Sequence, residues 1–316
     1  MVLPPLNEQR RIVAKLEDLL ARSRRAKDAL DAIPPLLEKL RQSILAAAFR
    51  GDLTADWRAQ HPDMEPVGSL LVRVPAPAGK NTGRDAGVQV REGRYALSVG
   101  LTERDIPEGW SWTPLLRIAK LESGHTPSRQ HASYWDGDIP WIGIKDAREH
   151  HGRVIEHTQQ TVSEEGLANS AARLLPARTV CLSRTASVGY VTIMGKPMAT
   201  SQDFADWVCS DAILPEFLMY ALLAEGDGLR DFGEGTTHTT IYYPELKALH
   251  ISLPPLAEQE RIVALVSARL AELNGLEELA AELRSRAATT DPAILAKAFR
   301  GELVPQDPND EPAAAM

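Results

Sequence analysis

The segments LPPLNEQRRIVA (residues 3–14) and LPPLAEQERIVA (residues 253–264) open two copies of one sequence, which close on ILAAAFRGDL (44–53) and ILAKAFRGEL (294–303). The offset is 250 residues at both edges, so the copies align without a gap, and 20 of the 51 aligned positions are identical. The identities gather at the two ends of the copy. This pattern predicts one structural element used twice around a single insert, and not a solenoid of stacked repeats.

Each copy is predicted to form a long helix. Apolar residues recur at spacings of three and four, or their multiples, from Ile12 to Ile44 and again from Ile262 to Leu283. Two such helices, joined through one insert, pack most simply antiparallel as a coiled-coil-like stalk, because each apolar seam needs a partner that buries it.

Proline and glycine mark the expected interruptions of these helices. Pro34 and its neighbour Pro35 predict a break in the first copy, because proline lacks the N–H donor and clashes with the preceding turn. In the second copy a break is expected at Pro292, with Asp291 capping a new helix. The Phe-Arg-Gly sequence that ends both copies supplies glycine as the C-cap.

The insert changes character along its length. Its first part is rich in Pro, Gly and Ala and is predicted to be a linker or mobile loop. Its second part has short segments with β-branched and aromatic residues, interrupted by one helix at roughly 215–223. The predicted fold is therefore α+β, with a strand-rich globular domain inserted between two long helices. The expected strands are IPWIGI (139–144), RTVCLSR (178–184), VGYVTIM (188–194) and ADWVCS (205–210).

Composition excludes several classes of protein. The net charge of −8 argues against a non-specific nucleic-acid binder. No basic arm is present, so a DNA ligand would need a shaped local face and a partner that supplies positive charge. The N-terminus lacks a signal peptide and no apolar run approaches a membrane span, which predicts a cytoplasmic protein without membrane contact. Cys181 and Cys209 are expected to be buried free thiols.

An ordered series of short motifs carries a family resemblance, and it leads directly into the second repeat. The chain resembles the specificity subunit of type I restriction-modification systems, in which a target-recognition domain is followed by a spacer helix. The motifs are PEGWSW (107–112), GHTPSR (124–129), YWDGDIPWI (134–142), LSRTASVG (182–189), TSQDF (200–204) and GEGTTHTTI (233–241), followed by ISLPPLAEQERIV (251–263).

The resemblance departs from the family in one respect. Members normally hold two recognition domains, each followed by one spacer helix, whereas this chain begins at a helix. The expectation is a half-length form with one recognition domain between two spacer helices; a natural half-subunit, a truncated gene and a cloned fragment all agree with it. The implied regions are a first spacer helix (1–60), a linker (61–105), the recognition domain (106–250), a second spacer helix (251–303) and a disordered tail (304–316).

The resemblance implies a non-catalytic subunit that directs a partner methyltransferase, and a restriction motor subunit, to a half-site or bipartite target in double-stranded DNA. A homodimer would supply a second recognition domain. No cofactor is expected, because the sequence lacks an Asn/Asp-Pro-Pro-Tyr tetrad, a P-loop and metal-ligand spacing. The alternative is a structural protein that docks partner helices, acting as an acidic DNA mimic that regulates restriction.

Residues able to read bases or hold phosphates follow the predicted strands. Arginine and lysine recognise guanine, asparagine and glutamine recognise adenine, and small hydroxyls contact phosphates. The four tryptophans between residues 110 and 141 are instead expected to pack in the core. The predicted DNA-binding residues are Lys145, Arg148, Ser183, Arg184, Ser187, Ser201, Gln202, Thr236, Thr237 and His238, and the residues expected to dock partners at the helix ends are Glu8, Gln9, Arg50, Glu258, Gln259 and Arg300.

Overall fold

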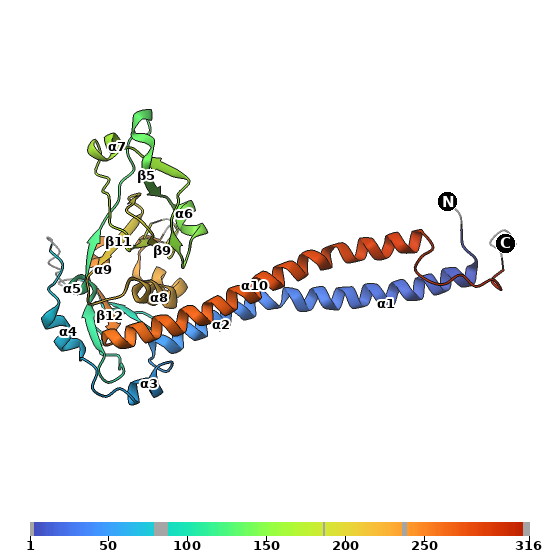
Figure 1. Ribbon diagram of the computed structural model, residues 1–316, viewed down its shortest axis with the longest axis horizontal. Helices are drawn as coiled ribbons and strands as arrows, with labels where there is room; N and C mark the ends of the chain where they lie inside the picture. The colour runs from blue at the N-terminus through green and yellow to red at the C-terminus, as the bar shows by residue number, and fades with distance from the viewer. Residues whose placement is uncertain (1–2, 79–87, 186, 236–238, 312–316) are drawn as a thin grey trace. The chain divides into compact units, whose positions relative to one another are not determined.

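The two repeated copies form helices in the computed structural model (Figure 1). The first copy forms α1 (Leu6–Asp31) and α2 (Ile33–Phe49), and the second forms the single helix α10 (Leu256–Phe299). The structure describes residues 3–78, 88–185, 187–235 and 239–311.

The chain divides into two units, and the division falls within α2 and α10. The first unit contains Met1–Arg41 and Ala268–Met316, and the second contains Gln42–Ser267. The mixed helix and sheet class predicted for the chain is confirmed.

Within the first unit the two copies run antiparallel. Ion pairs join the copies, Lys27 with Asp291 at 2.6 Å and Arg41 with Glu277 at 3.2 Å. Arg11 pairs at 2.5 Å with Asp310, which lies beyond the second copy in the segment expected to be a disordered tail. Partner numbers fall as the numbers along α1 and α2 rise, which is the register of an antiparallel pair. The predicted stalk is therefore present, with ion pairs along its length.

The predicted break of the first copy is confirmed, and that of the second copy is wrong. α1 ends before Ala32, and α2 begins directly before Pro34. α10 in contrast continues through Pro292. Asp291 does not cap a new helix, because its carboxylate accepts hydrogen bonds from Ser23 and Lys27 of α1. These bonds hold the helix in place across the proline, where one backbone hydrogen bond is missing.

Both copies end in the same way, as predicted. Gly51 has φ of +77° and Gly301 has φ of +72°, the left-handed conformation that glycine adopts without steric cost.

The second unit contains three sheets. The four-stranded sheet has the order β1-β2-β12-β3, the three-stranded sheet β10-β5-β7, and the five-stranded sheet β4-β11-β8-β9-β6. Pairings are antiparallel except β10 with β5 and β6 with β9. The strands are β1 (Arg91–Glu92), β2 (Leu97–Val99), β3 (Ser111–Pro114), β4 (Ala119–Glu122), β5 (Trp135–Ile142), β6 (Val154–Ile155), β7 (Gln160–Val162), β8 (Val180–Ser183), β9 (Val191–Met194), β10 (Ala199–Thr200), β11 (Phe204–Cys209) and β12 (Leu249–Leu253).

Short helices connect these strands. The predicted helix near residues 215–223 is α8, whereas Ile144, expected at the end of a strand, begins the helix α6. The helices are α3 (Ala55–Ala59), α4 (Val67–Arg73), α5 (Leu115–Ile118), α6 (Ile144–Glu149), α7 (Glu164–Ala168), α8 (Pro215–Glu225) and α9 (Tyr243–Lys247), with 3-10 turns η1 (Ala132–Tyr134) and η2 (Gly226–Phe232).

The segment 61–105, expected as a linker, contains ordered elements that contribute to the core. α4 buries Val67 and Leu70, and all three residues of β2 are buried between β1 and β12. The buried carboxylate of Glu225 also accepts hydrogen bonds from four successive backbone N–H groups of residues 94–97. Residues 94–97 are therefore fixed by one glutamate and by strand pairing, neither of which leaves a periodic pattern in so short a stretch.

Candidate functional site

A cavity of about 630 Å³ opens in the second unit beside β5. Strand pairing assembles its walls: Trp141 on β5 lies opposite Gln160 on β7 and Ala199 on β10. The loop after β4 and the turn after β10 therefore meet at the same end of β5. The lining includes Thr126, Arg129, Trp141, Lys145, Gln160 and Asp203. These side chains combine two cations, hydrogen-bonding amide and hydroxyl groups, one carboxylate and an aromatic surface.

The Arg129 guanidinium lies against two tryptophans at the edge of this cavity. Its central carbon is 4.5 Å from the Trp135 ring centroid and 5.9 Å from that of Trp141. The two indoles contact each other edge to face at 5.3 Å. Arg129 Nη2 also donates to Gln160 Oε1 at 3.2 Å. Cation–π contacts and one hydrogen bond thus hold the guanidinium in a defined plane.

Two of the predicted DNA-binding residues line the cavity, and a third is hydrogen-bonded to one of its lining residues. Lys145 is exposed in the first turn of α6 and lines it. Ser201 also lines it, but is buried and bonds to Asp203. The exposed side chain of Gln202 accepts a hydrogen bond from Thr126 at 2.7 Å. The remaining carboxamide N–H groups of Gln202 are free of any bond within the described part of the chain.

The residues predicted around the end of β8 have internal roles instead. Ser183 is buried and donates to the Ser187 carbonyl at 2.5 Å. Arg184 donates to the carbonyls of Gln202 at 3.0 Å and Ile241 at 3.5 Å, and its guanidinium covers the Tyr243 ring. These bonds and the ring contact brace the Arg184 guanidinium within the domain, and its contact with DNA stays a prediction.

The remaining predicted residues lie elsewhere. Arg148 is exposed in the last turn of α6, which is a helix and not the expected loop. Thr236, Thr237 and His238 lie outside the described residues.

Sequence reasoning missed Arg129, Thr126 and Gln160. Arg129 closes the motif GHTPSR, but its importance depends on the two tryptophans beside it, which the sequence predicted as core residues. Trp141 is indeed 5% exposed, so it packs in the core and also forms a cavity wall. An arginine six residues before a tryptophan is the only signal available in the sequence, and it is weak.

The titratable groups of the five-stranded sheet do not form a nucleophilic site; of its two cysteines, Cys181 is buried as predicted and Cys209 is half-buried. Burial raises the pKa of the Cys181 thiol well above its usual range, and raises the pKa of Cys209 to about 12. Both thiols stay protonated at neutral pH and are inert. Burial also raises the pKa of Asp206 to about 7, while Thr200 donates to one of its oxygens at 2.6 Å. The described residues contain no cluster of His, Cys, Asp or Glu able to hold a metal, and no helix among them is suited to cross a membrane.

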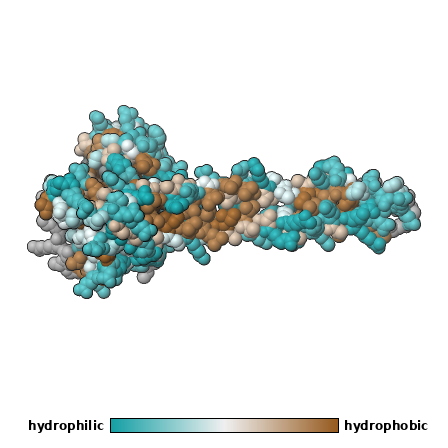
Figure 2. All heavy atoms as spheres, turned by 60° about the horizontal axis from the view of Figure 1, so that its bottom comes forward, coloured by the Kyte–Doolittle hydropathy of each residue, from teal (hydrophilic) through white to brown (hydrophobic). Residues whose placement is uncertain are grey.

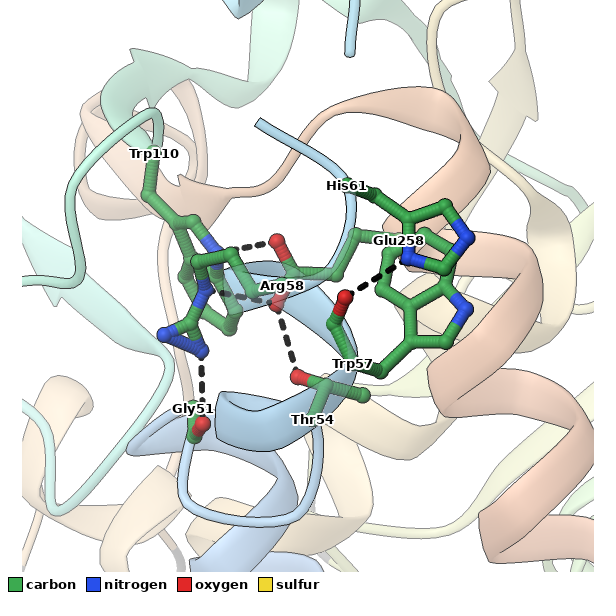
Figure 3. Close-up of polar contacts among 7 residues, drawn as sticks. All are labelled: Gly51, Thr54, Trp57, Arg58, His61, Trp110 and Glu258. Atoms are coloured by element: carbon green, nitrogen blue, oxygen red, sulfur yellow. Dashed lines mark hydrogen bonds and ion pairs between the residues drawn. The ribbon is translucent and has the colours of Figure 1, made fainter. Parts of the chain in front are cut away.

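Glu258, expected to dock a partner, is instead the centre of a buried polar cluster (Figure 3). One carboxylate oxygen accepts from Thr54 at 2.7 Å and from Arg58 at 3.1 Å, and the other accepts from the Trp110 indole at 2.9 Å. Glu258 is 0% exposed. It joins the start of the second copy to the segment that directly follows the first.

The neighbouring Gln259 is also fully buried. Its side-chain amide donates to the carbonyls of Ala212 at 3.0 Å and Pro254 at 3.1 Å, while its oxygen accepts from the Leu214 N–H at 3.0 Å. Glu258 and Gln259 therefore hold the start of α10 within the second unit. Both side chains are fully buried.

The equivalent positions of the two copies differ in burial. Phe49 is 2% exposed and packs on Phe217 with ring centroids 5.2 Å apart, whereas its counterpart Phe299 is 79% exposed. Leu253 is 0% exposed, but its counterpart Leu3 is 64% exposed. The end of the first copy and the start of the second are covered by the sheet-containing unit. The start of the first copy and the end of the second lie in the first unit, where Leu3 and Phe299 are exposed.

Of the other residues predicted to dock partners, Arg50 and Arg300 are exposed, whereas Glu8 is buried. Gln9 donates to the Pro4 carbonyl, while Glu8 is 5% exposed. Arg50 bonds to Asp52 at 2.8 Å and Arg300 to Glu302 at 2.9 Å, so the repeat preserves the same exposed pair in both copies.

An apolar surface follows the helices of the first unit, and Figure 2 shows apolar side chains gathered on one face of the paired helices. Leu36 and Leu40 are one turn apart on α2, and three leucines of α10 at spacings of three and four lie at the same level of the antiparallel register. All five are exposed by 39% to 61%. We call this set the leucine face; it comprises Leu36, Leu40, Leu276, Leu279 and Leu283.

Comparison with known proteins finds relatives that all belong to one family. The family model described as type I restriction modification DNA specificity domain matches residues 107–282, more than half of the chain. The MjaIX specificity subunit of Methanocaldococcus jannaschii is 30% identical over 164 residues, covering 51% of this chain and 38% of that protein. The EcoDI specificity subunit of Escherichia coli is 26% identical over 97% of this chain and 63% of that protein. The chain thus spans less than two thirds of either relative.

Solved structures show the same fold. A chain from a type I R-M system, studied for complex assembly and conformational transition, has a TM-score of 0.65 at 24% identity, covering 95% of this chain and 61% of that one. The HsdS subunit from Thermoanaerobacter tengcongensis has a TM-score of 0.54 at 24% identity, with 95% and 60% covered. These similarities confirm the predicted architecture of a strand-rich domain between long helices.

Proposed function

This chain belongs to the family of type I restriction-modification DNA specificity domains, and we propose that it recognises a DNA sequence for a partner methyltransferase. It would act in the cytoplasm as a non-catalytic subunit on double-stranded DNA. The relatives named above are specificity subunits, which gives no support to the alternative of an acidic DNA mimic.

The observation that carries this proposal is the chemistry of the cavity beside β5. Base edges in the major groove present both donors and acceptors, so their recognition needs fixed groups of both kinds. The cavity supplies donors in Arg129 and Lys145 and acceptors in Gln160 and Asp203. We therefore propose that residues 106–250 form the target-recognition domain, with β2 of the preceding segment completing one of its sheets.

We propose that DNA binding needs a partner protein, because the negative net charge of the chain opposes binding to DNA phosphates. The net charge is −8, and tight binding to phosphates requires several Lys or Arg contacts with release of counterions. The leucine face offers exposed apolar side chains at helical spacing, which suits an amphipathic helix of a partner. We propose that it docks the methyltransferase, and a restriction subunit where one is present.

The uncovered ends of the repeat leave exposed apolar side chains that a second protein could cover. Phe299 and Leu3 are exposed where their counterparts are buried, so this end of the first unit is suited to a second protein surface. We propose that a second copy of the chain covers this end, with the same apolar surface of each copy in contact. Such a dimer would bring a second recognition domain into the assembly and allow a bipartite target.

DNA binding with and without the methyltransferase tests the proposed function. Alone, the chain should bind any duplex only at the non-specific level, with Kd on the order of 10⁻⁴–10⁻⁶ M at physiological salt. With the methyltransferase, a recognised duplex should bind about 10³-fold or more tighter than a scrambled one. Fluorescence anisotropy titrations measure both constants, with the methyltransferase alone as the control. Equal affinities for recognised and scrambled duplexes in the complex would refute the proposal.

A further inference from the structure

The orientation of the Arg129 guanidinium is fixed in the protein without a ligand. Trp135 and Trp141 hold its plane, and both indoles are fixed by their own hydrogen bonds to the carbonyls of Ser128 at 3.3 Å and His125 at 3.1 Å. Ordering a long side chain in advance removes an entropy cost from the binding step. A fixed plane also selects ligands with two acceptors at matching spacing.

Most donors of this guanidinium are unused. Its one hydrogen bond goes to Gln160, and it forms no ion pair within the described ranges of the chain. Arg173 and Arg178 differ, because their guanidinium groups bind Glu122 and Glu216. Arg129 therefore keeps a pair of N–H groups available, although it stands beside a cavity with carboxylates in its wall.

Those carboxylates favour a base over a phosphate as the ligand. Asp146 and Asp203 line the same cavity as Arg129 and Lys145, so the formal charges cancel. A phosphate would meet two carboxylates in this space, and their repulsion opposes it. A base edge carries no net charge, and its exocyclic amino groups can donate to such acceptors.

We infer that Arg129 reads a guanine through its O6 and N7 atoms, with the tryptophan pair as the support that fixes its orientation. This inference rests on the proposed function and names one base that the recognition domain selects. The two-acceptor edge of guanine in the major groove matches the fork of an arginine, which forms bidentate hydrogen bonds with it. Trp135 and Trp141 are positioning residues in this arrangement, because they act through Arg129.

The experiment uses the full chain in complex with its methyltransferase, and duplexes carrying the motif that the wild-type complex methylates. Each guanine of the motif is replaced in turn by 7-deazaguanine, which keeps Watson–Crick pairing but lacks the N7 acceptor. For the wild-type complex we expect one position at which this replacement weakens binding by about 5- to 150-fold. In the complex with Arg129→Ala, the penalty at that position should disappear while penalties elsewhere remain.

Two further variants separate base reading from charge. Arg129→Lys keeps the cation but loses the fork, so it should not restore the 7-deazaguanine penalty. Arg230→Ala removes an exposed arginine that pairs with Asp227 on η2, away from the cavity lining, and should leave every penalty unchanged. Uniform weakening on all duplexes by Arg129→Ala, full rescue by lysine, or a motif without guanine would each overturn the inference. A wild-type complex without sequence preference would instead contradict the proposed function itself.

Discussion

Replacing Glu258 with alanine should lower the free energy of unfolding by about 3–5 kcal/mol, since it removes one partner of a buried ion pair. The carboxylate is 0% exposed and accepts from Thr54, Arg58 and Trp110. Its loss leaves Thr54 and the Trp110 indole without their acceptor, and leaves the largely buried Arg58 with only the Gly51 carbonyl. Urea denaturation followed by tryptophan fluorescence measures this change.

Two variants make the measurement specific. Glu258→Gln keeps the shape and one acceptor oxygen, so its loss of stability should be intermediate. Glu260→Ala, at an exposed position of the same helical turn, should stay within about 0.5 kcal/mol of wild type. A Glu258→Ala protein as stable as Glu260→Ala would show that the cluster does not hold the start of α10.

Alanine substitutions of the two phenylalanines at equivalent positions of the repeat should have very different effects on the free energy of unfolding. Phe49→Ala should cost about 3–5 kcal/mol, because it opens a cavity beside Phe217 in the core. Phe299→Ala, 250 residues further on, should change the stability of the monomer by less than about 0.5 kcal/mol, since this ring is 79% exposed. Unfolding at low protein concentration compares the two, each variant serving as the control for the other.

The same pair tests the proposed dimer. If a second copy covers the exposed end of the first unit, light scattering should give twice the monomer mass for the wild type, and Phe299→Ala should shift it toward the monomer. Phe49 lies in the covered region, so a folded conservative variant such as Phe49→Leu should still dimerise. A wild-type chain that stays monomeric at all accessible concentrations would refute the proposed homodimer.

The helices could be predicted because their signals repeat over many residues. Apolar spacing from Ile12 onward predicted the two helices, the glycines predicted their ends, and the connection through one insert favoured antiparallel packing. The continuous helix through Pro292 could not be predicted, because it depends on contacts of Asp291 with Ser23 and Lys27, which lie more than 260 residues away. Local rules describe the cost of a proline, while tertiary contacts decide whether the helix tolerates it.

The candidate site was predicted only in part, for a related reason. Lys145 and Gln202 both follow strands, and of the two Lys145 lines the cavity while Gln202 bonds to its lining residue Thr126. Arg184 and Arg129 look alike in sequence, since both follow a serine near a turn. Their roles separate only in three dimensions, where Arg184 meets backbone carbonyls and Arg129 meets tryptophans. The strand β2 was missed because three buried residues give no alternation to detect.

If this chain recognises the DNA target, it decides where a methyltransferase acts. The most direct measurement is methylome sequencing of a methylation-free host that carries the methyltransferase with this chain, the methyltransferase alone, or the chain alone. We predict methylation at one defined motif when both proteins are present, and none in either single-protein strain. The same motif modified by the methyltransferase alone, or no modified motif with both proteins present, would contradict the account.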